Sequence, residues 1–173
     1  MKKLWLILPI FLLLCGCGTQ ETLETVTDAE DTPTVATAQQ IIMELPEDVQ
    51  MQVLQSEDSG KLYVCEDFVI TVQTVPGGDL NRTVEAATGY KKDQLQLLQT
   101  QVDTAKRIES VWASTGEGEE QVGRLCILDD GNYHYVVTAM TGASKGGQLQ
   151  ETWNRFFDSV RLVGPEVSLN TGS

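Results

Sequence analysis

The sequence predicts an α+β fold in which an antiparallel β-sheet is flanked by helices. Three observations carry this prediction: four strand-like runs follow one another across short connections, a short helical pattern precedes them, and a longer amphipathic pattern follows them. Connections this short cannot hold the crossover helices of a parallel sheet, so consecutive strands are expected to run antiparallel.

The first strands are expected between residues 41 and 75. Residues 41–45 and 49–53 alternate in polarity on either side of a turn at Pro46-Glu47-Asp48. Residues 62–75 form a longer run rich in β-branched and aromatic residues, and the turn formers Pro76-Gly77-Gly78 end it.

A short helix is predicted immediately after this turn. Asp79 is a suitable N-cap, and Leu80, Val84 and Ala87 fall at i, i+4 and i+7 on one helical face. Gly89 stands where a left-handed C-cap belongs. The pattern therefore predicts a helix of about two to three turns.

An antiparallel meander is expected next. Its four strands are residues 95–102, 107–115, 121–128 and 133–141. Asp129-Asp130-Gly131-Asn132 joins the last two strands, and its composition suits the positive φ angles of a hairpin turn.

The clearest amphipathic helix lies near the C-terminus, after an expected loop at residues 142–147. Its apolar residues recur at i, i+4, i+7, i+8 and i+11, and they are Leu149, Trp153, Phe156, Phe157 and Val160. This spacing predicts a helix with its aromatic face against the sheet. Residues 160–163 either end the helix or form a last strand.

The order of these elements, together with the ending Phe157-Asp158-Ser159-Val160-Arg161-Leu162, resembles the PsbP-like and Mog-type families over roughly residues 45–163. The resemblance implies an α-β-α sandwich. It also implies an adaptor role, because members of these families are generally not enzymes. The matching positions are core positions, so the resemblance assigns no functional residue.

The N-terminus carries a lipoprotein signal. Lys2 and Lys3 precede an apolar run at residues 4–14, which is the length of a signal peptide and too short to span a bilayer. Leu14-Cys15-Gly16-Cys17 resembles the lipobox of bacterial lipoproteins, which implies cleavage after residue 16 and fatty acylation (diacylglyceryl and palmitate type) of Cys17. An ordinary cleaved secretory signal or an uncleaved anchor is the alternative.

The predicted chain then has three parts. Residues 17–40 are Thr-rich and acidic with few large apolar groups, so they are expected to be a disordered tether. Residues 41–164 are long enough for one domain with a single core. Residues 165–173 are expected to be a flexible C-terminal tail. The domain would stand outside the cytoplasm, lipid-anchored to the bacterial cell membrane.

The chain is strongly acidic, with a formal net charge of −13. Removal of the signal peptide would bring this to −15, because two lysines and no acidic residue are lost. Nucleic acid is excluded as a partner on this basis, since its binding depends on clustered Lys and Arg. The membrane and an unknown protein or envelope component are the expected partners.

Two thiols remain in the expected domain, Cys65 and Cys126. In an oxidising compartment a disulfide between them is the natural hypothesis, and two buried thiols are the alternative. No metal site is predicted at the pair, because neither a third Cys nor a nearby His completes it. No cofactor is expected.

Catalytic chemistry finds little support. His134 is the sole histidine and could be drawn into a triad with Asp129, but no nucleophile motif accompanies it, so an outward-facing strand histidine is expected instead. Tyr133 and Tyr135 share one strand face and are the candidate binding surface, as an exposed aromatic pair. The sequence therefore favours a non-catalytic binding or assembly module; a cell-envelope hydrolase or a cation-binding protein is the alternative.

Overall fold

The computed structural model describes residues 36–47, 49–52, 60–114 and 118–164. The predicted signal peptide, Cys17, most of the tether and the C-terminal tail lie outside these residues. Within the described part of the chain, no helix is long and apolar enough to cross a membrane.

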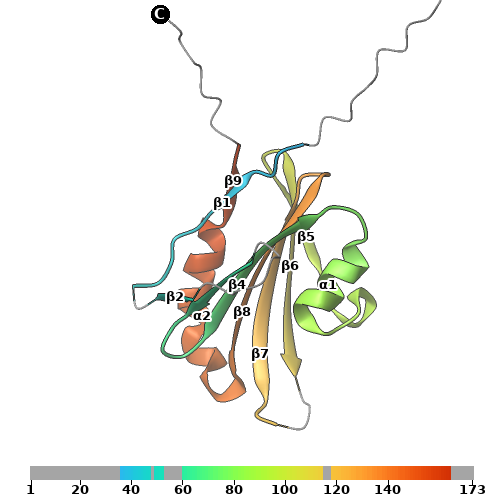
Figure 1. The fold of residues 1–173 in the computed structure, drawn as a ribbon. Helices are drawn as coiled ribbons and strands as arrows, with labels where there is room; N and C mark the ends of the chain where they lie inside the picture. Colours follow the sequence, from blue (N-terminus) through green and yellow to red (C-terminus); the bar gives the residue numbers. More distant parts are fainter. Residues whose placement is uncertain (1–35, 48, 53–59, 115–117, 165–173) are drawn as a thin grey trace, which may run out of the picture. The chain divides into compact units, whose positions relative to one another are not determined.

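The α+β fold with an antiparallel sheet flanked by helices is confirmed (Figure 1). The main sheet has seven strands, and every neighbouring pair is antiparallel. In spatial order they are β2 (Gln50–Gln52), β3 (Gly60–Val64), β4 (Val69–Pro76), β8 (Tyr133–Gly142), β7 (Gln121–Asp129), β6 (Ala105–Ser114) and β5 (Leu98–Val102).

The predicted meander forms one side of this sheet, from the edge strand β5 to the central strand β8. The strands β5, β6, β7 and β8 pair in sequence order, and Asp129 pairs with His134 across the expected Asp-Asp-Gly-Asn turn. The first of these strands begins later than predicted, at Leu98. Residues before it form the 3₁₀ helix η1 (Lys92–Gln94), and Leu95 and Leu97 pack into a core cluster, so tertiary burial overrides the strand pattern there.

The run at residues 62–75 is two strands, not one. It is broken where the Cys65 N–H donates to the Phe68 carbonyl at 2.9 Å, which closes the tight turn between β3 and β4. Residues 41–45 contain only the short β1 (Gln40–Ile42). This strand is outside the main sheet and pairs with β9 (Arg161–Val163) in a separate two-stranded sheet. Residues 160–163 therefore include a last strand, which was one of the two alternatives predicted.

The first helix, α1 (Leu80–Thr88), matches its prediction closely. The Asp79 carboxylate accepts a hydrogen bond from the Asn81 N–H at 2.9 Å, and Gly89 caps the C-terminus at φ 78°. The second helix, α2 (Ala143–Ser159), starts earlier than predicted. Residues 143–147 belong to its first turns, so the loop expected at residues 142–147 is wrong. The glycines in these turns weaken the sequence signal for a helix. In the folded protein the N–H of Ala143 donates to the carbonyl of Glu120, which directly precedes β7, and this bond holds the start of α2 beside the sheet.

The two helices lie on opposite sides of the main sheet (Figure 1). We call these sides the α2 face and the α1 face. Alternation along β7 divides its residues between them: Cys126 and Leu128 enter the cluster beneath α2, whereas Leu125 and Ile127 enter the cluster beneath α1. Period-two alternation thus supplies two separate cores from a single sheet.

Residues 36–40 are part of the domain and not of the tether. Ala38 and Ile41 pack against the core beneath α2, and the Tyr133 hydroxyl donates to the Ala36 carbonyl at 2.8 Å. The described domain therefore begins a few residues before the predicted boundary at residue 41, because these residues find hydrogen-bond partners in β8.

Cys65 and Cys126 are both described and buried, and no disulfide joins them. The reason is the strand order. Cys65 follows β3, whereas Cys126 lies in β7, three strands away across β4 and β8. Three strand spacings amount to about 14 Å, while a disulfide needs Cα atoms within about 7 Å. Burial instead raises the pKa of the Cys126 thiol to about 12.

Candidate binding groove

A groove runs along the α2 face, between α2 and the uncovered side of β6 and β5. The helix α2 contacts β8 and β7, and beyond them the sheet continues without a covering helix. The groove encloses about 960 Å³, a size that suits a small ligand or part of a macromolecule. We call it the α2–β6 groove; Leu98, Val111, Val122, Gly147, Gln150 and Trp153 are among the residues that line it.

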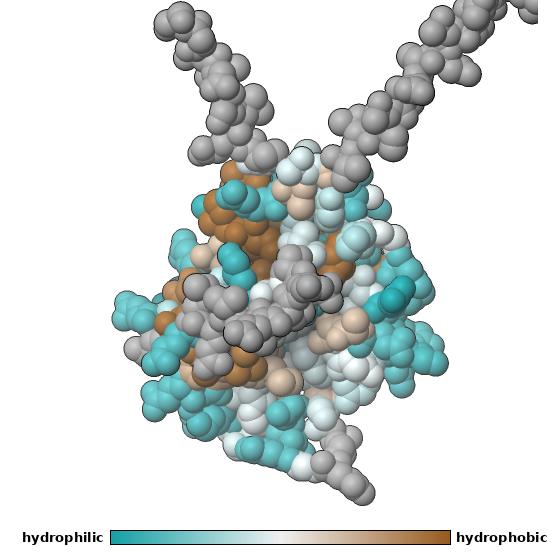
Figure 2. All heavy atoms as spheres, viewed as in Figure 1, coloured by the Kyte–Doolittle hydropathy of each residue, from teal (hydrophilic) through white to brown (hydrophobic). Residues whose placement is uncertain are grey.

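The floor of the groove is unusually exposed for a sheet face. Val111 in the middle of β6 is 70% exposed and Leu98 at the start of β5 is 63% exposed. Smaller exposed fractions, 36–38%, occur at Ile42, Leu45 and Val163, and Figure 2 shows the hydrophobic surface over β1 and β9 to which two of them belong. Large apolar side chains gathered on an open surface mark interaction sites. The groove is therefore a stronger candidate for a binding site than the surface over β1 and β9.

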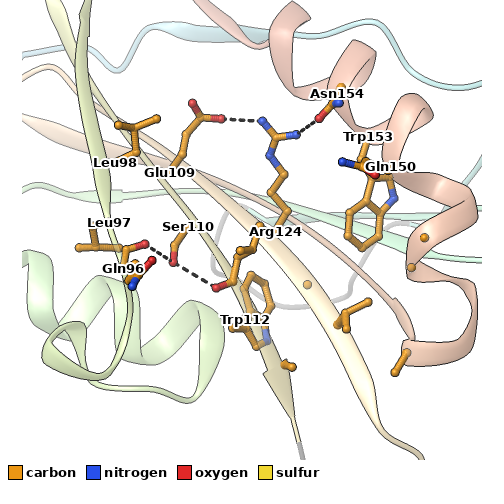
Figure 3. Close-up of a pocket in the computed structure, with 17 residues that line it drawn as sticks. Gln96, Leu97, Leu98, Glu109, Ser110, Trp112, Arg124, Gln150, Trp153 and Asn154 are labelled. Carbon is orange, nitrogen blue, oxygen red and sulfur yellow. Dashed lines mark hydrogen bonds and ion pairs between the residues drawn. The ribbon is translucent and has the colours of Figure 1, made fainter.

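A polar network stiffens the groove wall (Figure 3). The Arg124 guanidinium donates to the Glu109 carboxylate at 3.1 Å and to the Asn154 side-chain oxygen at 2.7 Å, so it ties β7 to both β6 and α2. Its planar group also lies over the ring of Phe157, 4.7 Å from the centroid. Such stacking adds to the ion pair and holds the guanidinium in one orientation.

Arg107 completes this network from beneath the end of α2. Its guanidinium pairs with Glu109 and donates to the carbonyls of Phe157 at 2.7 Å and Val160 at 3.1 Å. These carbonyls lie at the C-terminal end of α2, where the last acceptors lack the regular partners of the helix interior. The Phe157 carbonyl also accepts from the Val160 N–H at 3.1 Å. A buried cation at this position donates hydrogen bonds to these carbonyls and interacts favourably with the negative end of the helix dipole.

The ionisation of Glu109 follows from these contacts. Burial alone would raise the pKa of this carboxyl, but the hydrogen bonds and charges of Arg107 and Arg124 outweigh burial and hold the pKa below its ordinary value. Burial would likewise lower the pKa of Arg107, and the Glu109 carboxylate more than compensates. Glu109 and Arg107 therefore remain charged near neutral pH, and together with Arg124 they form a structural brace.

Trp153 borders the groove, whereas the side chain of Trp112, the residue after Val111 on β6, belongs to the core beneath α1. The indole of Trp112 lies over Gly123 on the neighbouring strand, and a Cβ at that glycine would come within 2.2 Å of the ring, so only glycine fits there. Trp153 is buried against the edge of Phe68, with ring centroids 6.1 Å apart. Its indole N–H finds no acceptor in the described part of the chain.

His134 is not the outward-facing strand histidine that the sequence predicted. It is buried on the α1 face, where its Nδ1 lies 2.7 Å from the Thr83 hydroxyl and its Nε2 lies 4.0 Å from the Asp129 carboxylate. The helix α1 covers the strand at this point. The histidine therefore joins α1 to the sheet, on the face opposite to the groove.

Tyr133 and Tyr135 do not form the exposed aromatic pair that we predicted. Tyr135 is fully buried and Tyr133 is half-buried, with ring centroids 6.2 Å apart. The Tyr135 hydroxyl donates to Asp130 and accepts from the Gln39 N–H, both at 2.8 Å. Burial is the main reason that the pKa of Tyr135 is raised to about 12. The incoming N-terminal segment covers both rings, which the strand pattern could not reveal.

Sequence reasoning missed the residues that form the groove. Arg107, Glu109 and Val111 alternate along one strand, and this period marks them as sharing a face. The pattern does not say which helix covers that face or how far. Across residues 36–47, 49–52, 60–114 and 118–164, no three His, Cys, Asp or Glu side chains gather as metal ligands.

No protein-family model matches the chain, and no curated protein matches it. Among solved structures, the chain is similar to a protein from Bacteroides thetaiotaomicron at 15% identity and a TM-score of 0.47, covering 71% of this chain and 45% of that one. It is also similar to LpqN of Mycobacterium tuberculosis, described as involved in cell envelope biogenesis, at 11% identity and a TM-score of 0.47, covering 74% and 85%. The chain thus spans less than half of the Bacteroides protein. The PsbP-like resemblance stays a prediction from the sequence pattern.

Proposed function

We propose that this chain is an extracytoplasmic lipoprotein, anchored through Cys17, whose α2–β6 groove binds a protein or envelope partner without catalysing a reaction. The carrying observation is the open apolar floor of the groove, with Val111 70% exposed and Leu98 63% exposed. The anchor rests on the sequence: the basic start, the short apolar run and the cysteine after Gly16.

A binding role suits the way in which polar groups are used around the groove. Glu109 is the carboxylate that lines it, and two arginines hold this group ionised, so it is not poised to donate a proton near neutral pH. His134 lies on the other face, bonded to Thr83. What the groove offers a ligand is apolar area beside a rigid wall, which favours recognition over proton transfer.

Site-specific crosslinking in the native envelope tests the groove. A photoactivatable amino acid replaces Val111 in one protein and Gln99 in another. Gln99 is exposed on the same sheet edge but is one residue out of phase with Leu98, so it points away from the groove. We expect a discrete crosslinked product from position 111 and none from position 99. Equal labelling from both positions would reject the groove as the binding site.

Substitution of the proposed lipidated residue tests the anchor. The Cys17→Ser protein should lose acylation. If it is cleaved elsewhere it should leave the detergent-phase fraction, and if it retains its signal peptide it should run at the mass of the uncleaved precursor. Membrane extraction followed by mass determination of the N-terminal peptide provides the measurement. A Cys15→Ser protein is the matched control, and it should remain acylated. Unchanged mature mass and membrane retention of Cys17→Ser would overturn the anchor.

A further inference from the structure

We propose that the occupant of the α2–β6 groove is a basic amphipathic α-helix of a partner protein, which lies beside α2 and completes the helical layer on that face. This inference rests on the proposed binding function and adds the conformation and charge of the ligand. Four features of the groove lead to it: its place on a sheet face, its width, its helical wall and its electrostatic surroundings.

The place of the groove favours a helix over a strand. Val111 is on the second strand from the edge and pairs with Arg124 of β7, whereas the ladder between β5 and β6 ends at Leu98 and Glu109. The side chain of Val111 stands above the plane of the sheet. An extended peptide that forms a ladder at the free edge of β5, or at the edge of β6 beyond Glu109, lies in the plane of the sheet and leaves the face above Val111 uncovered. A helix satisfies its backbone internally and can therefore lie on a sheet face.

The width of the uncovered strip also fits a helix. On the α2 face, β5 and the part of β6 beyond Arg107 are bare, and two strand spacings span about 9.6 Å. A helix with its side chains is about 10 Å across, and packed helices lie about 8–10 Å apart. A helix placed next to α2 would therefore sit directly above Leu98 and Val111 and bury both.

The wall that α2 presents to the groove allows this approach. Ala143, Gly146 and Gly147 line the groove from the first turns of α2. A Cβ added at Gly147 would meet no atom within 4 Å, so space is open beside it. Farther along the helix, Gln150 and Asn154 offer amide groups at the groove, and Asn154 is held by Arg124.

Charge decides which amphipathic helix fits. Arg107 and Arg124 share the single carboxylate of Glu109. Their other N–H groups donate to the side chain of Asn154 and to backbone carbonyls at the end of α2, so they offer few donors to an acidic ligand. Acidic side chains stand near the two ends of α2: the Glu119 carboxylate lies next to Gly142, and Asp158 is close enough to act on Arg107. With a net charge of −13 for the whole chain, a helix flanked by Lys and Arg is attracted and an acidic one is repelled. The same charge disfavours a second copy of this chain as occupant.

The test uses two synthetic peptides of identical leucine and lysine composition, each about 14 residues long. One places leucine with a period of 3.6 to form a basic amphipathic helix, and the other alternates leucine and lysine to form a strand. Binding to the full mature chain, carrying Cys17→Ser so that no detergent is needed, is measured by fluorescence anisotropy at physiological salt. We expect the helical peptide to bind at least about tenfold more tightly, because only it can bury both apolar floor residues.

Two variants of the floor separate apolar contact from simple charge attraction. Val111→Glu and Val111→Lys should both weaken the helical peptide, the lysine variant more strongly, by about tenfold or more. Because Val111 is 70% exposed, neither change should alter folding, which circular dichroism verifies. Gln99→Glu is the matched control, and it should leave binding unchanged.

Several outcomes would overturn the proposal. Equal or tighter binding of the alternating peptide would replace the helix by a strand at the β5 edge. Equal or tighter binding to Val111→Glu would reduce the effect to charge alone. A Val111-dependent dimer in sedimentation velocity would make a second copy the occupant. If any of these occurs while crosslinking at position 111 persists, the binding function stands and only the helical ligand fails.

Discussion

The α2 face has two halves built from the same kind of strands: a closed half that α2 covers, and an open half that it leaves exposed. Beneath α2, Tyr135, Val137 and Phe157 are fully buried. On the same face, Val111 two strands from β8 and Leu98 three strands from β8 are largely exposed. The difference is coverage, because a seven-stranded sheet is about 29 Å wide whereas one helix is about 10 Å across. Hydrophobic patterning alone therefore does not distinguish a core from a binding surface in this molecule.

The largest expected effect tests the closed half. Phe157→Ala removes a fully buried ring that packs on Phe156 and lies beneath the Arg124 guanidinium. We expect a loss of about 3–5 kcal/mol in the free energy of unfolding, since the cavity adds to the lost transfer energy. Urea denaturation followed by tryptophan fluorescence measures it. A loss of less than 1 kcal/mol would mean that α2 does not close this half.

A smaller loss is expected at the boundary between the halves. Arg107→Met removes the buried guanidinium that pairs with Glu109 and donates hydrogen bonds to the last carbonyls of α2. We expect a loss of about 3 kcal/mol in unfolding free energy, because these buried acceptors lose their donor. Arg155→Met is the control: its ion pair with Glu151 is solvent-exposed, so its stability should hardly change.

The same boundary predicts a dependence on pH. The pKa of Glu109 lies below its ordinary value of 4.5, so its contribution is fully present above that pH and is lost as the pH falls through the lowered value. The free energy of unfolding of the wild type should exceed that of Glu109→Gln by about 2 kcal/mol near neutral pH. This difference should shrink in acid, as thermal unfolding from about pH 7 to pH 3 would reveal. Glu151→Gln, an exposed control, should give no such trend.

The smallest effect is expected on the open half. Val111→Ala should change the free energy of unfolding by less than about 0.5 kcal/mol, because the side chain is mostly hydrated in the folded protein. Val137→Ala on the same sheet face is the matched partner, and its burial predicts a loss of about 2 kcal/mol. Similar losses at both valines in the isolated protein would contradict the distinction between the two halves.

Much of the fold was predictable because its signals are local. Asp79 and Gly89 bound the first helix as their capping chemistry required. The Asp-Asp-Gly-Asn turn placed β7 against β8 in the expected register. The apolar spacing from Trp153 to Val160 gave the buried face of α2. Each of these patterns depends on residues less than about twelve positions apart.

The site was far less predictable. Tyr135 and His134 have the polarity of surface residues, yet the N-terminal segment covers one and α1 covers the other. Cys65 and Cys126 have the parity to share a core but lie three strands apart. Val111 has the sequence appearance of a core residue and is exposed. In each case the outcome depends on a partner dozens of positions away.

The sequence by itself determined the strands of the meander, the two helices and their inward faces, because side-chain periodicity and capping act over a few residues. Only the tertiary structure decided where α2 crosses the sheet. That placement fixes which strands stay bare, and it brings Arg107, Glu109 and Arg124 together at the border of the groove. The physical reason is that burial is a property of the assembled layers, whereas periodicity is a property of the chain.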